Sequence, residues 1–400
     1  MKNIIEKQNL NNLLSTLIKI PSPYFEEEKI MEYACSWLKQ RNVPAQIHRY
    51  HEKEITNFEG MNVIGTIDSG KEGPVIYFNG HLDTVRLCSG WTQPPYDAVV
   101  KDGNMYGVGA LDMKSGCAII MEVLAEFVKN VSDFRGKIIY NLVSDEEGPF
   151  GLGTTYLIND KKIQMADLAI ITEPSAGFAR VKSPSISLGA RGGYNYKVKL
   201  YGKSSHAAAP ELGINALLDA AKLACELEKT EMKEDEKLGK GSHCLIGMSG
   251  GGQSCSVPDY AEIEVFRHIV RGEGIDTIKE EIHEAAKRAD LTSKYKIELR
   301  SSPAENFDGG FEPYVIDENN KYLDMLKKSI NKVCGEDASI TYFKSMGDFN
   351  YIGGKLSIPT VIFGPEGENY HGSDEYVNLD SVWETAQSIY DFLVCTLSQD

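Results

Sequence analysis

Residues 75–85 read VIYFNGHLDTV, in which an apolar run is followed by a histidine and an aspartate. Val75 to Phe78 form a short apolar run, which is typical of a strand buried on both faces of a sheet. His81 and Asp83 follow directly, where such a strand ends. In α/β proteins, functional side chains gather in the loops at the carboxyl ends of the strands. The stretch therefore predicts an α/β fold with a functional site beside this strand.

Other short apolar runs along the chain also indicate buried strands, and the segments between them have helical periodicity. The predicted strands are Lys137 to Val143, Leu168 to Ile171 and Pro359 to Phe363. The predicted helices are Cys117 to Val128, Asp317 to Val333 and Leu379 to Leu397. This alternation predicts a largely parallel sheet covered by helices.

The middle of the chain predicts a second, smaller unit. Between Ser185 and Arg300 the order is β-α-β-β-α-β, which is the ferredoxin-like pattern. The chain has 400 residues, which exceeds what one hydrophobic core usually supports. We therefore expect a catalytic domain of residues 1–184 and 301–400, with residues 185–300 inserted as an α+β domain.

Composition excludes several classes of partner. The formal net charge is −16, so phosphate backbones and anionic lipid surfaces should repel the chain, and we expect neither nucleic acid nor membrane as a partner. No apolar run is long enough to span a bilayer, and the first residues are polar rather than signal-like. The eight cysteines include no CxxC pair. That pattern predicts a cytoplasmic protein without disulfides or a thiolate zinc site.

Carboxylates and a second histidine lie in four further short motifs. They are Asp112 in GVGALDMK, Glu146 and Glu147 in SDEEG, Glu173 in IITEP, and His371 in NYHGSDE. Singly, each carboxylate could be a helix cap or a solvated loop residue, and a lone histidine is usually structural. Brought together with Asp83, however, these carboxylates would repel and raise one another's pKa values. Divalent cations would relieve the repulsion, and mixed histidine and carboxylate ligands suit zinc.

In order along the chain, GHLDTV, GxxDMK, DEE, TEP and HGSDE resemble the motifs of the M20 metallopeptidases. This family includes aminoacylases, acetylornithine deacetylase, succinyl-diaminopimelate desuccinylase and glutamate carboxypeptidase. The segment GARGGYNYKVKLYGKSSHAAAPELGINAL is similar to the start of the family's lid domain, and the resemblance runs from Leu13 to the C-terminal helix. It implies an α/β/α zinc-peptidase-like catalytic domain with an inserted ferredoxin-like lid, and a homodimer formed through the lid.

The resemblance also implies a role for each motif residue. Asp112 would bridge two zinc ions, with cobalt or manganese as alternatives. His81 and Glu173 would complete one metal site, and Glu147 and His371 the other. Asp83 would orient His81, Glu146 would be the general base for the metal-bridged water, and Asp112–Met113 would be a cis peptide.

Two lid residues are implied in substrate binding. His206 resembles the lid histidine that stabilises the oxyanion, often from the other subunit. Arg267 resembles the arginine that binds a substrate carboxylate, and an exposed surface pair is the alternative for it. The chain departs from the family at Gln253 to Ser256 and at Leu87 to Gly90. These departures connect it with a less characterised subgroup, and the selenium-metabolism-linked hydrolases are our candidate.

The predicted function is hydrolysis of an amide bond in a small N-acyl amino acid or dipeptide-like substrate that carries a carboxylate. One alternative is a hydrolase of other C–N bonds, such as those of ureido or carbamoyl compounds. A non-catalytic metal-dependent binding protein is the other. Glu146 argues against the last, because a binding protein needs no base beside Glu147.

Overall fold

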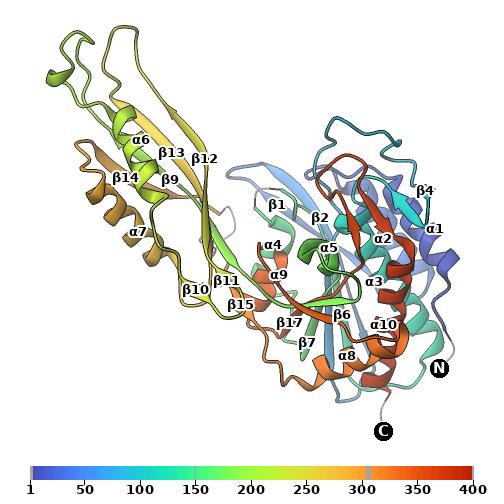
Figure 1. The fold of residues 1–400 in the computed structure, drawn as a ribbon. Helices are drawn as coiled ribbons and strands as arrows, with labels where there is room; N and C mark the ends of the chain where they lie inside the picture. The colour runs from blue at the N-terminus through green and yellow to red at the C-terminus, as the bar shows by residue number, and fades with distance from the viewer. Residues whose placement is uncertain (1–2, 149, 303–306, 308, 399–400) are drawn as a thin grey trace.

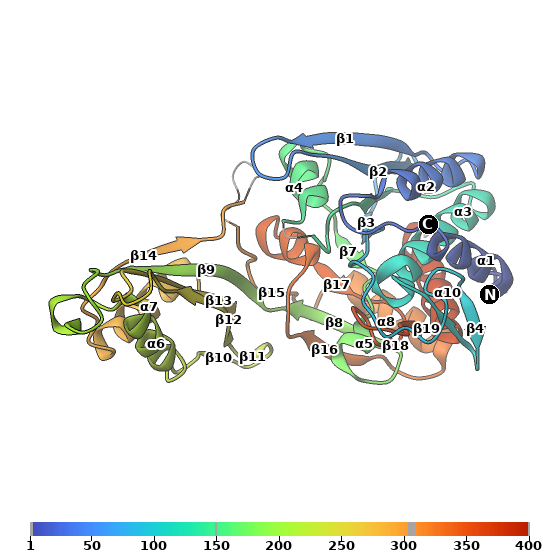
Figure 2. The ribbon, with the colours of Figure 1, turned by 90° about the horizontal axis from the view of Figure 1, so that it is seen from above.

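The computed structural model describes residues 3–148, 150–302, 307 and 309–398. Two bodies are visible in Figures 1 and 2: a large one built on a nine-stranded sheet, and a slender one built on a four-stranded sheet. The N-terminal and C-terminal parts of the chain both lie in the large body, and the middle forms the slender one. The inserted arrangement predicted from the sequence is therefore confirmed.

The nine-stranded sheet has the order β1-β2-β6-β3-β7-β17-β8-β15, with β16 paired to β8. The strands are β1 (Gln46–Glu52), β2 (Phe58–Asp68), β3 (Val75–His81), β6 (Lys137–Val143), β7 (Leu168–Ile171), β8 (Ser185–Ala190), β15 (Tyr314–Val315), β16 (Ser339–Phe343) and β17 (Thr360–Ile362). The four central strands β6, β3, β7 and β17 are parallel, as predicted. The flanking strands β1 and β2 are antiparallel, so only the centre of the sheet fits the prediction.

Helices cover both faces of this sheet, because its central strands are apolar on both sides. In β3, Ile76 and Phe78 face one core cluster and Tyr77 faces another. The helices of the first core are α1 (Lys7–Ile18), α2 (Glu28–Gln40), α3 (Ser115–Asn130), α8 (Lys321–Cys334) and α10 (Leu379–Leu397). Shorter helices outside that core are α4 (Leu152–Asn159), α5 (Ser175–Ala179) and α9 (Asp348–Asn350), followed by the turn η3 (Tyr351–Lys355). The result is the predicted α/β/α catalytic layer.

Capping residues set the ends of several helices. The predicted helix from Asp317 begins instead at Lys321, because the Asn320 side chain accepts hydrogen bonds from the N–H groups of Tyr322 and Leu323. This contact satisfies N–H groups that have no partner within the helix. Asn378 caps α10 in the same way. No helix among the described residues has both the length and the apolar character needed to cross a bilayer.

The slender body is the ferredoxin-like unit, and we call it the lid. Its sheet order is β12-β13-β9-β14, all antiparallel. Its elements are β9 (Gly192–Tyr201), η2 (Pro210–Leu212), α6 (Ala216–Leu227), the hairpin β10 (Glu234–Asp235) and β11 (Gly239–Lys240), β12 (Ser242–Gly250), β13 (Tyr260–Ile269), α7 (Ile275–Arg288) and β14 (Lys294–Leu299). Both helices contribute to one core with the buried face of the sheet.

The strand pairing places the start of the lid a few residues after the boundary predicted at Ser185. Strand β8 pairs with β15, β16 and β17 of the large sheet, whereas β9 begins the lid sheet at Gly192. Strand β14 ends at Leu299, one residue before the other predicted boundary at Arg300. As a division into domains, 185–300 remains our proposal, with the crossing placed between Ala190 and Gly192.

A third, four-stranded sheet bears directly on the site. Its order is β18-β19-β5-β4, with β4 (Val99–Lys101), β5 (Asn104–Tyr106), β18 (Gly367–Glu368) and β19 (Tyr376–Asn378). Tyr106 and Tyr376 are paired across β5 and β19. The chain that leaves β5 towards Asp112 therefore runs beside the chain that enters β19 from His371.

Candidate metal centre

Three of the predicted site segments follow neighbouring parallel strands. His81 is the last residue of β3 and is paired with Val143, the last residue of β6. The loop with Glu146 and Glu147 starts after Val143. Glu173 lies two residues after β7, which pairs with β3 on its other side. Because parallel strands end at the same edge of a sheet, this topology brings a histidine and three glutamates together.

The small third sheet positions the two remaining predicted site segments, those of Asp112 and His371. Asp112 lies in the helical turn η1 (Ala110–Lys114) that follows β5, and His371 lies in the loop before β19. The peptide bond between Asp112 and Met113 is cis, as the family resemblance implied.

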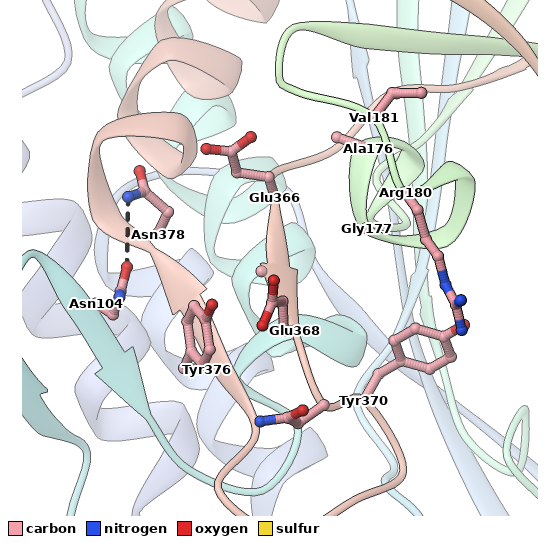
Figure 3. A pocket seen from close by; sticks show the side chains of 12 residues that line it. Asn104, Ala176, Gly177, Arg180, Val181, Glu366, Glu368, Tyr370, Tyr376 and Asn378 are labelled. Atoms are coloured by element: carbon pink, nitrogen blue, oxygen red, sulfur yellow. Dashed lines mark hydrogen bonds between the residues drawn. The ribbon is translucent and has the colours of Figure 1, made fainter.

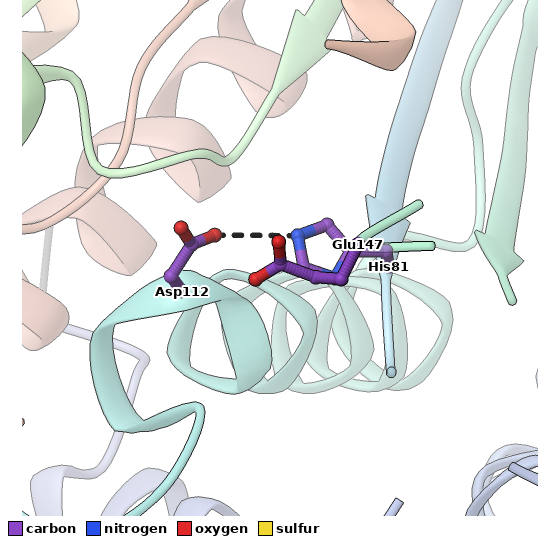
Figure 4. Close-up of side chains that lie close together, drawn as sticks. All are labelled: His81, Asp112 and Glu147. Carbon is purple, nitrogen blue, oxygen red and sulfur yellow. Dashed lines mark hydrogen bonds and ion pairs between the residues drawn. The ribbon is translucent and has the colours of Figure 1, made fainter. Parts of the chain in front are cut away.

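The side chains of His81, Asp112 and Glu147 point towards one another (Figure 4), and one ligand atom from each lies within 4.8 Å of the others. His81 Nε2 is 3.3 Å from Asp112 Oδ1 and 3.3 Å from Glu173 Oε1. His371 Nε2 is 3.4 Å from Asp112 Oδ2 and 2.8 Å from Glu147 Oε1. The two carboxylate oxygens of Asp112 thus face two different imidazoles, each of which has its own glutamate.

Burial and crowding shift the protonation of this cluster. Burial and the charge of Asp112 raise the pKa of Glu147 to about 8. Burial and Asp112 also raise the pKa of Glu173 well above its usual value. Hydrogen bonds to Asp112 and Glu147 raise the pKa of His371 to about 11. Without a cation, the cluster therefore retains protons on both its carboxylates and its imidazoles at pH values where isolated groups would have lost them.

Glu146 is held beside the cluster but does not pair with either imidazole at short range. Its Oε2 is 3.9 Å from His81 Nε2, and its Oε1 accepts a hydrogen bond of 3.2 Å from the Asp348 N–H. Its side chain is 15% exposed, more than that of Glu173 at 5%. Glu146 therefore lies beside the cluster and is partly open to solvent.

Asp83 lies behind His81. The Nδ1 atom of His81 is 3.1 Å from the main-chain oxygen of Asp83 and 3.6 Å from its Oδ1. The other oxygen of Asp83 accepts a hydrogen bond of 2.9 Å from the Glu147 N–H. Asp83 thus contacts His81 and the loop of Glu147 together. In metal centres, such a contact on one ring nitrogen directs the other nitrogen towards the metal.

The donor set fits divalent cations. Both imidazoles present Nε2 to carboxylate oxygens, and Glu173 Oε2 is buried without a hydrogen-bond partner. A buried, unpaired carboxylate oxygen is costly unless a cation or proton satisfies it. Nitrogen and oxygen donors without thiolates suit zinc, cobalt or manganese. Two cations that share Asp112 would use every one of the five predicted ligands.

The structure contradicts the predicted substrate contact of Arg267. Its side chain has no exposed surface, and its Nη2 atom is 2.7 Å from both Glu273 and Glu281. Strand β13 buries alternate residues, and Arg267 belongs to the face that packs against the lid helices. Its guanidinium is therefore already paired inside the lid, away from any substrate. The alternative of an exposed surface pair is wrong as well.

We expect Arg267→Ala to destabilise the lid by roughly 3–5 kcal/mol, because it leaves two buried carboxylates without a cation. The matched control is Arg271→Ala, since Arg271 also pairs with a carboxylate, that of Asp235, but is 41% exposed; an exposed pair contributes about 0–1 kcal/mol. Urea unfolding of both variants measures the difference. Equal losses in the free energy of unfolding would show that the buried ion pairs of Arg267 stabilise the lid no more than the exposed pair does.

His206 is not brought to the cluster within this chain. It is exposed, its Nδ1 accepts the Ala208 N–H, and it follows the far end of β9. A strand of ten residues spans roughly 30 Å, so His206 lies about that far from the base of the lid. In this arrangement His206 is therefore not among the side chains of this chain's own cluster, and a role at a partner's centre remains a prediction.

One contact of the site was not foreseen. Asp348, whose N–H holds Glu146, is buried and its carboxylate hydrogen-bonds Thr154. The neighbouring Gly347 has no room for a side chain, because a Cβ there would lie 2.8 Å from Glu146 Oε1. The sequence SMGDF had no strand-end signal that singled it out. These contacts join segments some 200 residues apart.

A hollow of about 900 Å³ lies on the outer side of the loop that carries His371. Figure 3 shows Glu366, Glu368, Tyr370 and Tyr376 around it, with Asn378 hydrogen-bonded to Asn104. Among the described residues, none of the clustered imidazoles and carboxylates lines this hollow. The site chemistry therefore belongs to the cluster and not to this hollow.

Comparisons with known proteins agree with this geometry. Residues 77–394 match the family described as peptidase family M20/M25/M40. Succinyl-diaminopimelate desuccinylase of Sulfurovum sp. (strain NBC37-1) is 26% identical over 94% of this chain and 95% of its own length. The enzyme of the same name from Ehrlichia ruminantium (strain Welgevonden) is 28% identical over 95% of this chain and 96% of its own.

Solved structures show the same fold. A tripeptidase from Staphylococcus aureus subsp. aureus Mu50 superposes with a TM-score of 0.79 at 22% identity, covering 98% of this chain and 99% of its own. A Bacillus subtilis protein described as a dinuclear metal binding peptidase from the M20 family gives 0.72 at 14% identity, with coverages of 98% and 99%. These likenesses extend over both the catalytic body and the lid.

Proposed function

The chain belongs to peptidase family M20/M25/M40, and from that premise we propose that it is a two-zinc hydrolase of an amide bond in a small N-acyl amino acid or dipeptide-like substrate. One observation carries the proposal: Asp112 lies between two imidazoles, each with its own glutamate. His81 and Glu173 would hold one cation, and Glu147 and His371 the other. Cobalt or manganese are alternatives with the same donor preference.

When held by these five ligand side chains, two such cations would lower the pKa of a water molecule and polarise the scissile carbonyl. Glu146 accepts a proton from the water, and the oxygen forms a bond to the carbonyl carbon. When the C–N bond breaks, Glu146 passes that proton to the leaving amine. The products are a carboxylic acid and an amine, and Glu146 is again a carboxylate. Its exposure towards the outside of the cluster supports both transfers.

The substrate class is supported by the relatives. Two of them are named desuccinylases of succinyl-diaminopimelate, which is an N-acyl amino acid, and a structural neighbour is a tripeptidase. We propose that the substrate carries a carboxylate and that Arg191 meets it in place of Arg267. Arg191 is half-buried at the crossing into the lid, and burial lowers its pKa. Its Nε donates to the Leu238 carbonyl, and among the described residues no hydrogen bond of its two outer guanidinium nitrogens is seen.

The experiment is a hydrolysis panel with zinc, cobalt or manganese added to the metal-free protein. The panel contains N-succinyl and N-acetyl amino acids, dipeptides and tripeptides, N-carbamoyl amino acids, and carboxyl-capped versions of each. We expect turnover of an N-acyl amino acid or a small peptide that a chelator abolishes and that capping weakens. Preferred turnover of carbamoyl compounds would favour the alternative of other C–N bonds. Turnover that survives chelation would contradict the proposal.

We also propose that the protein is a homodimer through the lid and that His206 acts on the partner's substrate. Strand β12 is an edge strand, and exposed apolar side chains lie on it and on α6: Leu218, Leu245, Ile246 and Met248. Such a patch on a strand edge favours pairing with another chain.

All eight cysteines are unpaired, which supports the cytoplasm as the proposed location.

The variant Ile246→Lys should convert the dimer into a monomer and lower kcat/KM, because a charge on the edge strand opposes pairing. Light scattering measures the mass. Val100→Lys, which changes an apolar residue of similar exposure on the catalytic body, should leave both the mass and kcat/KM unchanged. A monomeric wild-type protein would refute the dimer and the role of His206.

A further inference from the structure

The loop that carries His371 ends in a carboxylate to which the proposed chemistry assigns no task. Glu375 precedes β19 and is 2% exposed. Its main-chain oxygen accepts a hydrogen bond of 3.0 Å from the Gly107 N–H, which continues the pairing of β19 with β5. The two loops that supply Asp112 and His371 are therefore joined at this residue.

The Glu375 side chain reaches further into the Asp112 loop. Its Oε2 accepts the Gly109 N–H at 2.8 Å, and its Oε1 accepts the N–H groups of Leu111 and Asp112, both at 2.9 Å. Hydrogen bonds to a charged acceptor are roughly twice as strong as those between neutral groups. One carboxylate therefore binds the backbone at Asp112 itself and at two residues just before it.

The loop needs such an acceptor. Gly109 has a φ of 75°, and the chain reverses there before the turn η1 begins. Residues 109–112 are buried, and a buried N–H without a partner costs stability. Within the part of the chain that the structure describes, no neighbouring strand provides carbonyl groups for the N–H groups of Leu111 and Asp112, and the Glu375 carboxylate provides the oxygens instead.

We propose that Glu375 is a positioning residue that fixes the Asp112 carboxylate between the two cation sites. This inference rests on the proposed two-cation function. A few residues of one loop then do two tasks: His371 contacts one cation, and Glu375 orients the ligand that both cations share. Residues that orient metal ligands typically change metal affinity by 10–100-fold when they are replaced.

The test is a cobalt titration of the metal-free protein, followed by visible absorption and by competition with a chelator. Glu375→Ala should weaken cobalt binding by about 10–100-fold and change the visible band, because Asp112 loses its fixed direction. The cobalt affinity of Glu375→Gln should lie between those of the wild-type protein and Glu375→Ala. Its amide oxygen still accepts the N–H groups of Leu111 and Asp112, but its NH₂ group faces the Gly109 N–H and cannot accept it. If Glu375→Ala does not fold, Glu375→Gln decides by the same titration.

Glu52→Ala is the matched control. Glu52 is 1% exposed and also accepts several backbone N–H groups, from Glu54, Ile55 and Thr56, but in the loop after β1. The Glu52→Ala substitution should lower the unfolding midpoint without changing cobalt binding. Overlaid cobalt titrations of wild type and Glu375→Ala would overturn the inference alone. A wild-type protein that binds no cobalt would overturn the proposed function and this inference together.

Discussion

Glu146→Gln should lower kcat by roughly 10²–10⁴-fold, the usual contribution of a general base, while the protein keeps two cations per chain. The reason is positional. Glu146 lies next to the cluster, 3.9 Å from His81 Nε2, but the closest contacts of both imidazoles are made by other carboxylates. Removing its charge should leave the five ligand side chains in place. Steady-state kinetics and metal analysis on the same preparation measure both effects.

The control for this variant is Glu126→Gln. Glu126 lies on α3 and pairs with Lys129, away from the cluster, so neither kcat nor metal content should change. A Glu146→Gln protein with wild-type kcat would refute the base assignment. Loss of a cation in that variant would assign Glu146 to the ligands instead.

Asp112→Ala should remove both cations and lower kcat/KM by roughly 10³-fold or more. Its two oxygens face different imidazoles, so its loss opens both sites at once. Metal ions supply several kcal/mol of transition-state stabilisation, and each 1.36 kcal/mol corresponds to a factor of ten in rate. Metal analysis after dialysis, together with kcat/KM, gives the result.

Asp160→Ala is the companion variant, because Asp160 also pairs with a histidine, His48, but outside the cluster. It should retain both cations and wild-type kcat/KM. An Asp112→Ala protein that still bound two cations would show that the sites do not share this ligand.

The strongest sequence signals were those of the buried core. Strands β6 and β7 and helix α10 have the predicted bounds, since their apolar residues form short runs, interrupted in β6 by Asn141, or recur with clear helical spacing. Strands β1 and β2 were not predicted. Strand β1 reads QIHRYHE and lies at the edge of the sheet; its buried residues include the polar His48 and Glu52, so the apolar signal is weak.

Part of the gathering was predictable, because His81, the two glutamates of SDEEG and Glu173 follow parallel strands whose carboxyl ends meet. Asp112 and His371 are placed by a third sheet that the sequence did not predict. The substrate role predicted for Arg267 was wrong, although the sequence pattern indicated its burial. Ile263, Val265 and Ile269 lie an even number of residues from Arg267 along the strand, so their side chains and that of Arg267 share the buried face of the lid sheet. The contacts of Glu375 and Asp348 were beyond reach, because each joins segments more than 200 residues apart without a local pattern.

Anomalous diffraction from zinc-loaded crystals, recorded on both sides of the zinc absorption edge, would show directly whether Asp112 joins two cations. We expect two peaks about 3.5–4 Å apart, the usual spacing of paired catalytic metals. One peak should lie between His81 and Glu173, the other between Glu147 and His371, and both should contact Asp112. A single peak, or peaks away from Asp112, would refute the shared site.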